Sequence, residues 1–346
     1  MDKTTSHLLN DRRFRLIFWG AAAALVIALS YTGWVVFGGE RMPVRLVVYA
    51  SSVQQEALTQ GIFPAFKDKW QAATGRDLTI EGVFDSSEAL ARQINLGAAA
   101  DIAIFTHTQP VTTLRFGRQI NRNAQPTVIG CTPMVIVTRP GNPKSIAEFS
   151  DLSQPGLNLI HADPADSGFG QWALLAEYGS AFVESQDAQM AEQKLMEIWR
   201  NVRVITPSAR TAMTLFELGA GDALVTCEQD ARLAIDRGAD LEIVVPSTSV
   251  FAQPVAILID SNISRNEREA AEAFLEFLVS HEARQIFASY YLYAWDDVCQ
   301  AFPGITNTFT VDDMGGWNEV FRNIWQKKIE PFIEADITPS QLDVRH

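Results

Sequence analysis

The sequence predicts an α/β protein with two lobes, preceded by one membrane-crossing helix. Runs typical of buried strands alternate with amphipathic, helix-like segments over most of the chain. The length of 346 residues exceeds the ~250–300 residues at which a single hydrophobic core stops growing, which favours two lobes. An apolar segment of 22 residues without any charge lies near the N-terminus.

The N-terminal apolar segment begins at Leu16 and ends at Phe37. As a helix it would span about 33 Å, enough to cross the hydrocarbon core of a bilayer. Basic residues precede it, which predicts a cytoplasmic N-terminus and an exported body: Lys3, Arg12, Arg13 and Arg15. A cleaved signal peptide is the alternative, with a weak site at residues 28–30, but the apolar run continues past that site. We therefore expect an uncleaved single-pass anchor in the inner membrane, with the body in the periplasm or another extracytoplasmic space.

The composition excludes several classes of partner. The formal net charge is −13, and no cluster of Lys and Arg follows the N-terminal segment, so a nucleic acid is not expected to bind. The five histidines show no metal-ligand spacing and the chain lacks a nucleotide-binding phosphate loop, so no metal or other cofactor is expected. The three cysteines form no CxxC motif: Cys131, Cys227 and Cys299. One pair of them can form a disulfide in an oxidising compartment, and the sequence does not choose the pair.

The expected elements alternate from the first strand onward. Strands are expected where short apolar runs end in polar turns: residues 44–50, 78–83, 102–105, 127–138, 157–161, 202–205, 222–226, 241–245 and 254–259. Helices are expected where apolar residues recur at helical spacing: residues 54–74, 88–96, 145–152, 172–178, 186–200, 211–218, 266–280 and 282–291, and a loop with a helix at 311–332. This alternation predicts parallel strands, whose carboxyl ends carry the ligand site.

The segment at residues 161–180 joins a turn of small residues directly to a helix. Asp163 and the proline after it open the turn, and either Asp166 or Ser167 can cap the helix. Gly168 leaves the first helical N–H groups open to a ligand oxygen, at the positive end of the helix dipole. By itself the segment is either an anion site or an ordinary helix start.

Five stretches, taken together and in this order, resemble the sulfate and thiosulfate binding proteins of ABC importers, within the type II periplasmic solute-binding superfamily. They include DPADSGFGQWALLAEYG and PSARTAMTLFELGAGDALVTCEQDA, and they cover residues 139–156, 163–179, 207–231, 242–260 and 309–321. The resemblance implies two lobes that close over a ligand, joined by crossovers near 125–127 and 245–250. The division that follows is 1–43 for the N-terminus, anchor and linker, 44–126 for lobe 1, 127–246 for lobe 2, and 247–346 for the rest of lobe 1 with the C-terminal helices.

The resemblance also implies which residues form an anion pocket between the lobes. The expected set is Ser51, Ser52, Ser87, Ser167, Gly168, Phe169, Ala209, Arg210 and Cys227. Neutral N–H and O–H donors suit a desolvated oxyanion because they avoid a buried ion pair. Ser51 and Ser52 are equally suited to capping the helix that follows them. Arg210 can instead bind an acidic side chain of the other lobe.

The chain departs from the family's pattern at several pocket positions. Asp85, Glu88 and Asp166 place carboxylates where the family has glycine or threonine. Cys227, a weak donor, stands where the family has a tryptophan whose indole N–H reaches the anion. Like charges a few ångströms apart repel, so these carboxylates are expected to weaken the binding of sulfate itself if they face the cleft.

The function expected from these features is solute binding for an ABC-type importer, with a small oxyanion or small polar anion as ligand and a permease and ATPase as partners. The alternative is a membrane-anchored sensory or scaffold protein that keeps the two-lobed fold without feeding transport. An enzyme is not expected, because Ser167 lacks the glycine two residues before the serine of a nucleophile elbow.

Overall fold

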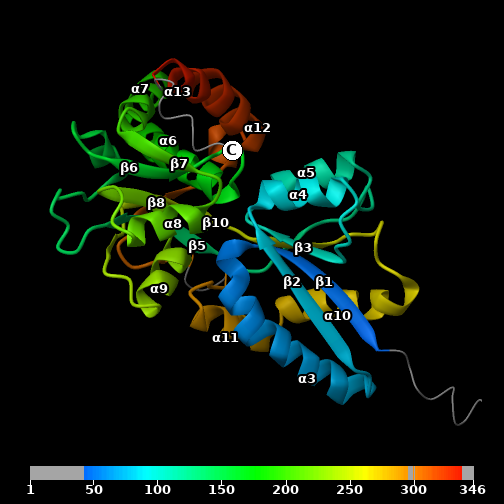
Figure 1. Ribbon diagram of the computed structural model, residues 1–346. Coiled ribbons are helices and arrows are strands. Elements are labelled where there is room, and N and C mark those ends of the chain that lie inside the picture. The colour runs from blue at the N-terminus through cyan, green and yellow to red at the C-terminus, as the bar shows by residue number, and fades with distance from the viewer. Residues whose placement is uncertain (1–42, 295–298, 300, 337–346) are drawn as a thin grey trace, which may run out of the picture.

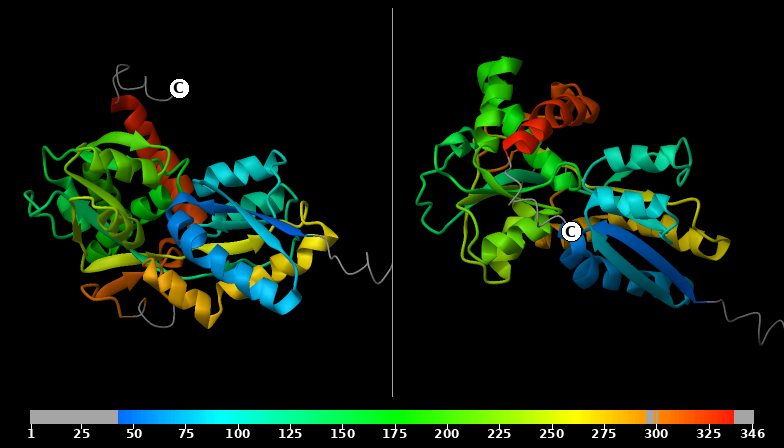
Figure 2. Two further views of the ribbon diagram at one scale, coloured as in Figure 1. Left: turned by 60° about the horizontal axis from the view of Figure 1, so that its bottom comes forward. Right: turned by 45° about the horizontal axis from the view of Figure 1, so that its top comes forward.

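The computed structural model describes residues 43–294, 299 and 301–336, and these residues form two α/β lobes (Figure 1). Each lobe is built on its own sheet. The sheet of lobe 1 has the strand order β2-β1-β3-β11-β4, and the sheet of lobe 2 has the order β12-β10-β5-β8-β6-β7, with β9 paired to β5. Two further views show the lobes side by side, one blue to cyan with yellow segments and the other green with the red C-terminal helices (Figure 2). The predicted two-lobed α/β fold is confirmed.

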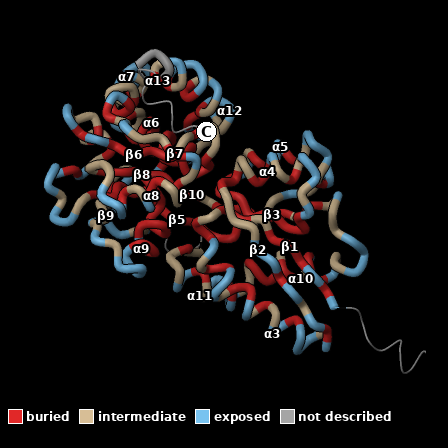
Figure 3. The backbone as a smooth tube through the Cα atoms, viewed as in Figure 1, coloured by how far each residue is buried: buried red, intermediate tan, exposed pale blue. Residues whose placement is uncertain are grey.

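Three neighbouring strands of lobe 1, from the edge strand β2 to the central β3, are parallel, because β1 pairs in parallel with both β2 and β3. Its strands are β1 (Val44–Ser51), β2 (Leu78–Asp85), β3 (Ile102–Phe105), β4 (Thr127–Val128) and β11 (Val255–Leu258). Its helices are η1 (Ser52–Gln54), η2 (Ala57–Ile62), α3 (Phe63–Thr74), α4 (Ser87–Asn95), α5 (Gln109–Phe116), α10 (Arg265–Leu278) and α11 (His281–Ser289). Helices α4 and α5 cover one face of the sheet, and α3 and α10 cover the other (Figure 1). Strands β1 and β3 are therefore largely buried on both faces, whereas the edge strand β2 is largely exposed or intermediate (Figure 3).

Lobe 2 is a mixed sheet with one long helix buried against it. Its strands are β5 (Thr132–Thr138), β6 (Leu159–Ala162), β7 (Val202–Thr206), β8 (Ala223–Cys227), β9 (Glu242–Val244), β10 (Thr248–Ala252) and β12 (Asn307–Phe309). Its helices are η3 (Phe149–Ser153), α6 (Gly168–Ser185), α7 (Ala188–Trp199), α8 (Ala209–Glu217), α9 (Glu228–Asp236), η5 (Asp312–Met314), α12 (Trp317–Glu319), η6 (Val320–Ile329) and α13 (Glu330–Asp336). The first fourteen residues of α6 are buried, so over this length the helix is covered on every side.

The chain passes between the lobes at three points of the described structure. The first lies between β4 and β5 and the second between β10 and β11, since these neighbours in sequence belong to different sheets. Both lie a few residues later than the crossovers expected near 125–127 and 245–250. The third lies between α11 and β12, and the sequence did not predict it. A disulfide joins Cys131 at the first crossing to Cys299 at the third, whereas Cys227 is free and buried.

The C-terminal helices pack on lobe 2. Val320, Ile324 and Trp325 lie in the same apolar cluster as the core of α6, and β12 pairs with β10. Gly179 of α6 permits this pairing, because a Cβ there would lie 2.1 Å from a ring carbon of Phe309. Of the expected lobe 1 segment 247–346, only β11, α10 and α11 lie in lobe 1. The apolar face of the C-terminal helix explains the difference, since lobe 2 offers the complementary surface.

Within the described residues we find no helix whose length and apolar character would let it cross a bilayer. The predicted anchor from Leu16 to Phe37 lies outside the described residues.

Candidate functional site

Helices begin directly after the strands of both sheets at the boundary between the lobes. In lobe 1, η1 follows β1, α4 follows β2, and a turn containing Thr106 follows β3. In lobe 2, α6, α8 and α9 follow β6, β7 and β8. The carboxyl ends of parallel strands share one edge of a sheet, so these helix starts gather at one place in each lobe. The candidate site is built where the two groups meet.

The start of α6 has the geometry of an anion site. Ser167 is the N-cap, and its Oγ accepts a hydrogen bond of 3.2 Å from the N–H of Gly170. The N–H groups of Gly168 and Phe169 have no acceptor within the helix, because the carbonyl groups four residues before them lie outside it. These two N–H groups are therefore available to a ligand. All three residues at this helix start are buried. Ser167 as the cap was one of the two predicted possibilities.

Gly168 lies directly against lobe 1. A Cβ at this position would lie 2.0 Å from the Oγ1 of Thr106 and 3.2 Å from the Nε2 of His107. One turn later, the indole N–H of Trp172 donates to the carbonyl oxygen of Thr106 at 2.9 Å. The lobes are therefore closed on each other at this point, and only glycine fits there.

Ser87 reaches the same point from lobe 1. It is the first residue of α4, after the N-cap Ser86, and its side chain is buried. Its Oγ accepts from the N–H of Thr106 at 3.0 Å and lies 3.3 Å from the Thr106 Oγ1. Thr106 thus connects Ser87 with Gly168. The sequence reasoning missed Thr106 and His107, although both follow the predicted strand at 102–105 in the way that Ser51 follows the first strand.

The first turn of lobe 1 also reaches lobe 2. Ser51 is buried at the N-cap of η1 but makes no side-chain capping bond, and Ser52 is partly exposed. The next residue, Val53, belongs to the apolar cluster of lobe 2 that contains Phe169, Ala209 and Cys227. The turn after β1 and the starts of α6, α8 and α9 therefore meet in one region between the lobes.

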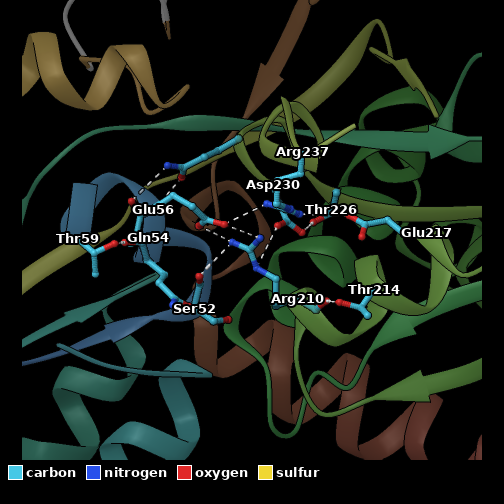
Figure 4. A network of polar contacts seen from close by, with 12 residues as sticks. Ser52, Gln54, Glu56, Thr59, Arg210, Thr214, Glu217, Thr226, Asp230 and Arg237 are labelled. Carbon is cyan, nitrogen blue, oxygen red and sulfur yellow. Dashed lines mark hydrogen bonds and ion pairs between the residues drawn. The ribbon is translucent and has the colours of Figure 1, made fainter. Parts of the chain in front are cut away.

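Arg210 binds the opposite lobe, which is the second of the two roles expected for it. Its guanidinium donates to both carboxylate oxygens of Glu56, at 3.1 and 2.8 Å, and to the carbonyl oxygen of Ser52 at 3.2 Å (Figure 4). Arg237 also donates to Glu56, at 3.0 Å. Close by, Gln54 of lobe 1 and Gln229 of lobe 2 exchange side-chain amide hydrogen bonds of 2.7 and 3.3 Å. These contacts hold the lobes together beside the helix starts.

Asp230 adds a buried carboxylate to this network. Its Oδ1 lies 3.8 Å from the Nε of Arg210, and Thr226 donates to its other oxygen at 3.4 Å. Burial raises the pKa of Asp230, while the guanidinium of Arg210 lowers it. The positive charge of Arg210 therefore stabilises the ionised form of Asp230 against the effect of burial.

Cys227 occupies the N-cap of α9 without a side-chain capping bond and is fully buried. Burial raises the pKa of the Cys227 thiol well above its ordinary value. The side chain is therefore a neutral thiol, a weak donor of the kind expected at this position.

Two of the three additional carboxylates have partners of their own. Asp85 accepts from the N–H of Ser86 at 2.7 Å, and Asp166 pairs with Arg92 of lobe 1 at 2.9 Å. Glu88 differs, because it lies at the lobe boundary and accepts from the side-chain amide of Gln171 in α6 at 3.3 Å. Among these three carboxylates, Glu88 has one buried oxygen, Oε2, without a hydrogen-bond partner.

Comparisons with known proteins identify the family and the fold. Residues 46–292 match a family described as bacterial extracellular solute-binding protein. The sulfate-binding protein of Escherichia coli strain K12 is 31% identical over 274 residues, which cover 74% of this chain and 82% of that protein. The thiosulfate-binding protein of the same strain is 28% identical over 316 residues, covering 85% of this chain and 92% of that protein. The solved structure of the sulfate-binding protein SubI from Mycobacterium tuberculosis H37Rv has a TM-score of 0.74 at 23% identity, and covers 82% of this chain and 99% of that one.

Replacing Gly168 with Ala should disturb the contact between the lobes. The added Cβ overlaps Thr106, and overpacking of this kind costs about 1–3 kcal/mol of unfolding free energy. Thermal and denaturant unfolding would measure the loss, and small-angle scattering would show a wider molecule. The double variant with Thr106→Ala should recover part of the loss. If the single variant is as stable and compact as the original chain, these two residues do not form the closing contact.

Replacing Arg210 with Met should make stability depend more steeply on pH. Without this cation the pKa of Asp230 rises further, so above the ordinary value of 3.8 the folded chain keeps a proton that the unfolded chain has released. The unfolding free energy should therefore fall as pH rises through the window between those two pKa values. Denaturant unfolding at about pH 5 and about pH 8 would measure the difference. Arg268→Met, in an exposed ion pair of lobe 1, is the control and should leave the pH profile unchanged; the same profile for both variants would contradict the prediction.

Proposed function

The chain belongs to the family of bacterial extracellular solute-binding proteins, and we propose that it captures a small anion between its lobes and delivers it to an ABC-type importer. A permease and an ATPase are the partners that such a receptor serves. The named relatives bind sulfate or thiosulfate, which supports an oxyanion as the ligand class. The family is a transport component, and the proposal assigns the chain no chemical reaction.

The observation that carries the proposal is the approach of the α6 N-terminus to Thr106 and Ser87. Helical N–H groups from lobe 2 and hydroxyl groups from lobe 1 lie together in a buried region. Such neutral donors stabilise a desolvated oxyanion without burying a second charge. The only guanidinium of the predicted set, Arg210, is held by Glu56 and leaves the anion to these donors.

The contacts between the lobes favour a receptor over a scaffold. Trp172 with Thr106, Arg210 with Glu56, and the paired amides of Gln54 and Gln229 all join residues of different lobes. They are polar contacts that water can replace when the lobes separate, which suits opening and closing around a solute. A scaffold whose lobes stay together does not require an interface whose hydrogen bonds water can replace.

One member of an oxyanion panel should stabilise the full chain in detergent. A ligand at about 100 times its Kd adds about 2.7 kcal/mol to the unfolding free energy, which raises the melting temperature by several degrees. The panel comprises sulfate, thiosulfate, molybdate, phosphate, small carboxylates, and alkyl sulfonates and phosphonates with and without an amino group. Ser167→Glu should abolish the shift, because the new carboxylate occupies the anion site, whereas Ser261→Glu on the exposed surface of lobe 1 should not. A panel without any shift would overturn the receptor proposal.

The segment from Leu16 to Phe37 is proposed to remain as an N-terminal anchor in the inner membrane, with residues 44–336 on the extracytoplasmic side. Its support is its length, its lack of charge and the basic residues before it. The intact mass of the membrane-extracted protein tests this directly. The expected mass includes the first residues of the chain, and a mature N-terminus near residue 31 would show a cleaved signal peptide instead.

A further inference from the structure

A cavity of about 180 Å³ lies beside the proposed anion site, at the boundary between the lobes. Its walls come from α4 and α5 of lobe 1 and from α6 of lobe 2, with a ring of η6 at one side. The lining residues that matter here are Glu88, Arg92, Gln109, Gln171 and Phe321. The cavity is therefore assembled only when the lobes come together.

Three buried acceptor oxygens of these lining residues have no hydrogen-bond partner: Oε2 of Glu88, Oε1 of Gln109 and Oε1 of Gln171. Gln171 is 3% exposed, and its amide orientation is determined by its neighbours. Its Nε2 donates to Glu88 Oε1 at 3.3 Å and to the carbonyl oxygen of Pro164 at 3.0 Å, which leaves Oε1 as an acceptor. A buried acceptor without a donor is unfavourable, so these three oxygens favour an occupant that donates hydrogen bonds, water included.

The cavity adjoins the anion site through two residues. Gln171 lies one turn after Ser167 in α6, and its N–H donates to the Ser167 carbonyl oxygen at 3.0 Å. Glu88 follows Ser87 in α4. Its Oε1 lies 3.3 Å from the Nε2 of His107, the atom that faces Gly168. One ligand can therefore contact both the α6 N-terminus and the cavity.

The charges around the cavity favour a cationic donor there. At the rim, the positive charge of Arg92 is neutralised by its ion pair with Asp166. His107 accepts from the N–H of Gln109 at its Nδ1, at 3.2 Å, so Nε2 carries the ring hydrogen. This Nε2 lies 3.3 Å from Oε1 of Glu88 without forming a hydrogen bond. The second oxygen of Glu88 still lacks a donor. The negative charge of Glu88 repels a fully deprotonated dianion such as sulfate, whereas it attracts an ammonium group.

We propose that the ligand is a small zwitterion, with a sulfonate or phosphonate group at the α6 N-terminus and an ammonium group in the cavity. The ammonium donates its hydrogens to Glu88 and Gln171, and a short alkyl chain joins the two groups. This proposal rests on the proposed function and names the ligand class of the same cleft. It also explains why a carboxylate lies next to a site for anions.

The test is calorimetric titration of the full chain in detergent with matched pairs of probes. Each pair differs only in the amino group: 2-aminoethanesulfonate with ethanesulfonate, 3-aminopropanesulfonate with propanesulfonate, and 2-aminoethylphosphonate with ethylphosphonate. In at least one pair the amino compound should bind about tenfold or more tightly, as for a hydrogen bond to a charged group. Glu88→Gln should reduce that preference to near unity, and the control Glu282→Gln, an exposed carboxylate of α11, should keep it.

Each outcome of the titration separates this proposal from the proposed function. If sulfate or an alkyl sulfonate binds and no amino compound binds more tightly than its partner, the zwitterion proposal is wrong and the receptor function stands. If the amino preference survives Glu88→Gln, the cavity is not its cause and the proposal is also wrong. If no probe in this set or in the oxyanion panel binds, both proposals fail together.

Discussion

The contact between Gly168 and Thr106 is the constraint on which the arrangement of the two lobes depends. It brings the start of α6 in lobe 2 within contact of the turn after β3 in lobe 1, with no room for a Cβ. Trp172 and Ser87 both bond to Thr106, so the same threonine receives groups from each side of the boundary. The proposed anion site is therefore made of backbone and hydroxyl groups whose positions are determined by the lobe contact itself.

Charge is distributed around this contact so that ion pairs join the lobes, while neutral N–H and O–H groups line the proposed anion site. Arg210 and Arg237 converge on Glu56, and Arg92 binds Asp166, in each case across the boundary. These ion pairs are partly exposed, so each contributes modestly to stability and breaks readily when the lobes separate. The guanidinium of Arg210 is thereby committed to the contact between the lobes.

Much of this arrangement is predictable from the sequence because it is local. The strands, the N-cap at Ser167 and the open N–H groups at Gly168 follow from side-chain patterns within a few residues. Pairings between distant residues are not local, so the third crossing, the pairing of β12 with β10 and the choice of Cys131 with Cys299 could not be predicted. The role of Thr106 was missed for another reason: its importance depends on which helix of the opposite lobe lies against it.

The bond between Cys131 and Cys299 ties the first crossing to the third, so two of the three connections between the lobes move as one unit. This bond limits how far the first and third crossings can separate when the lobes move. Thiols stay reduced in the cytosol and become oxidised outside it. The bond between the two crossings thus forms only in an oxidising compartment, and protein produced in a reducing cytosol would have lobes joined by the chain alone.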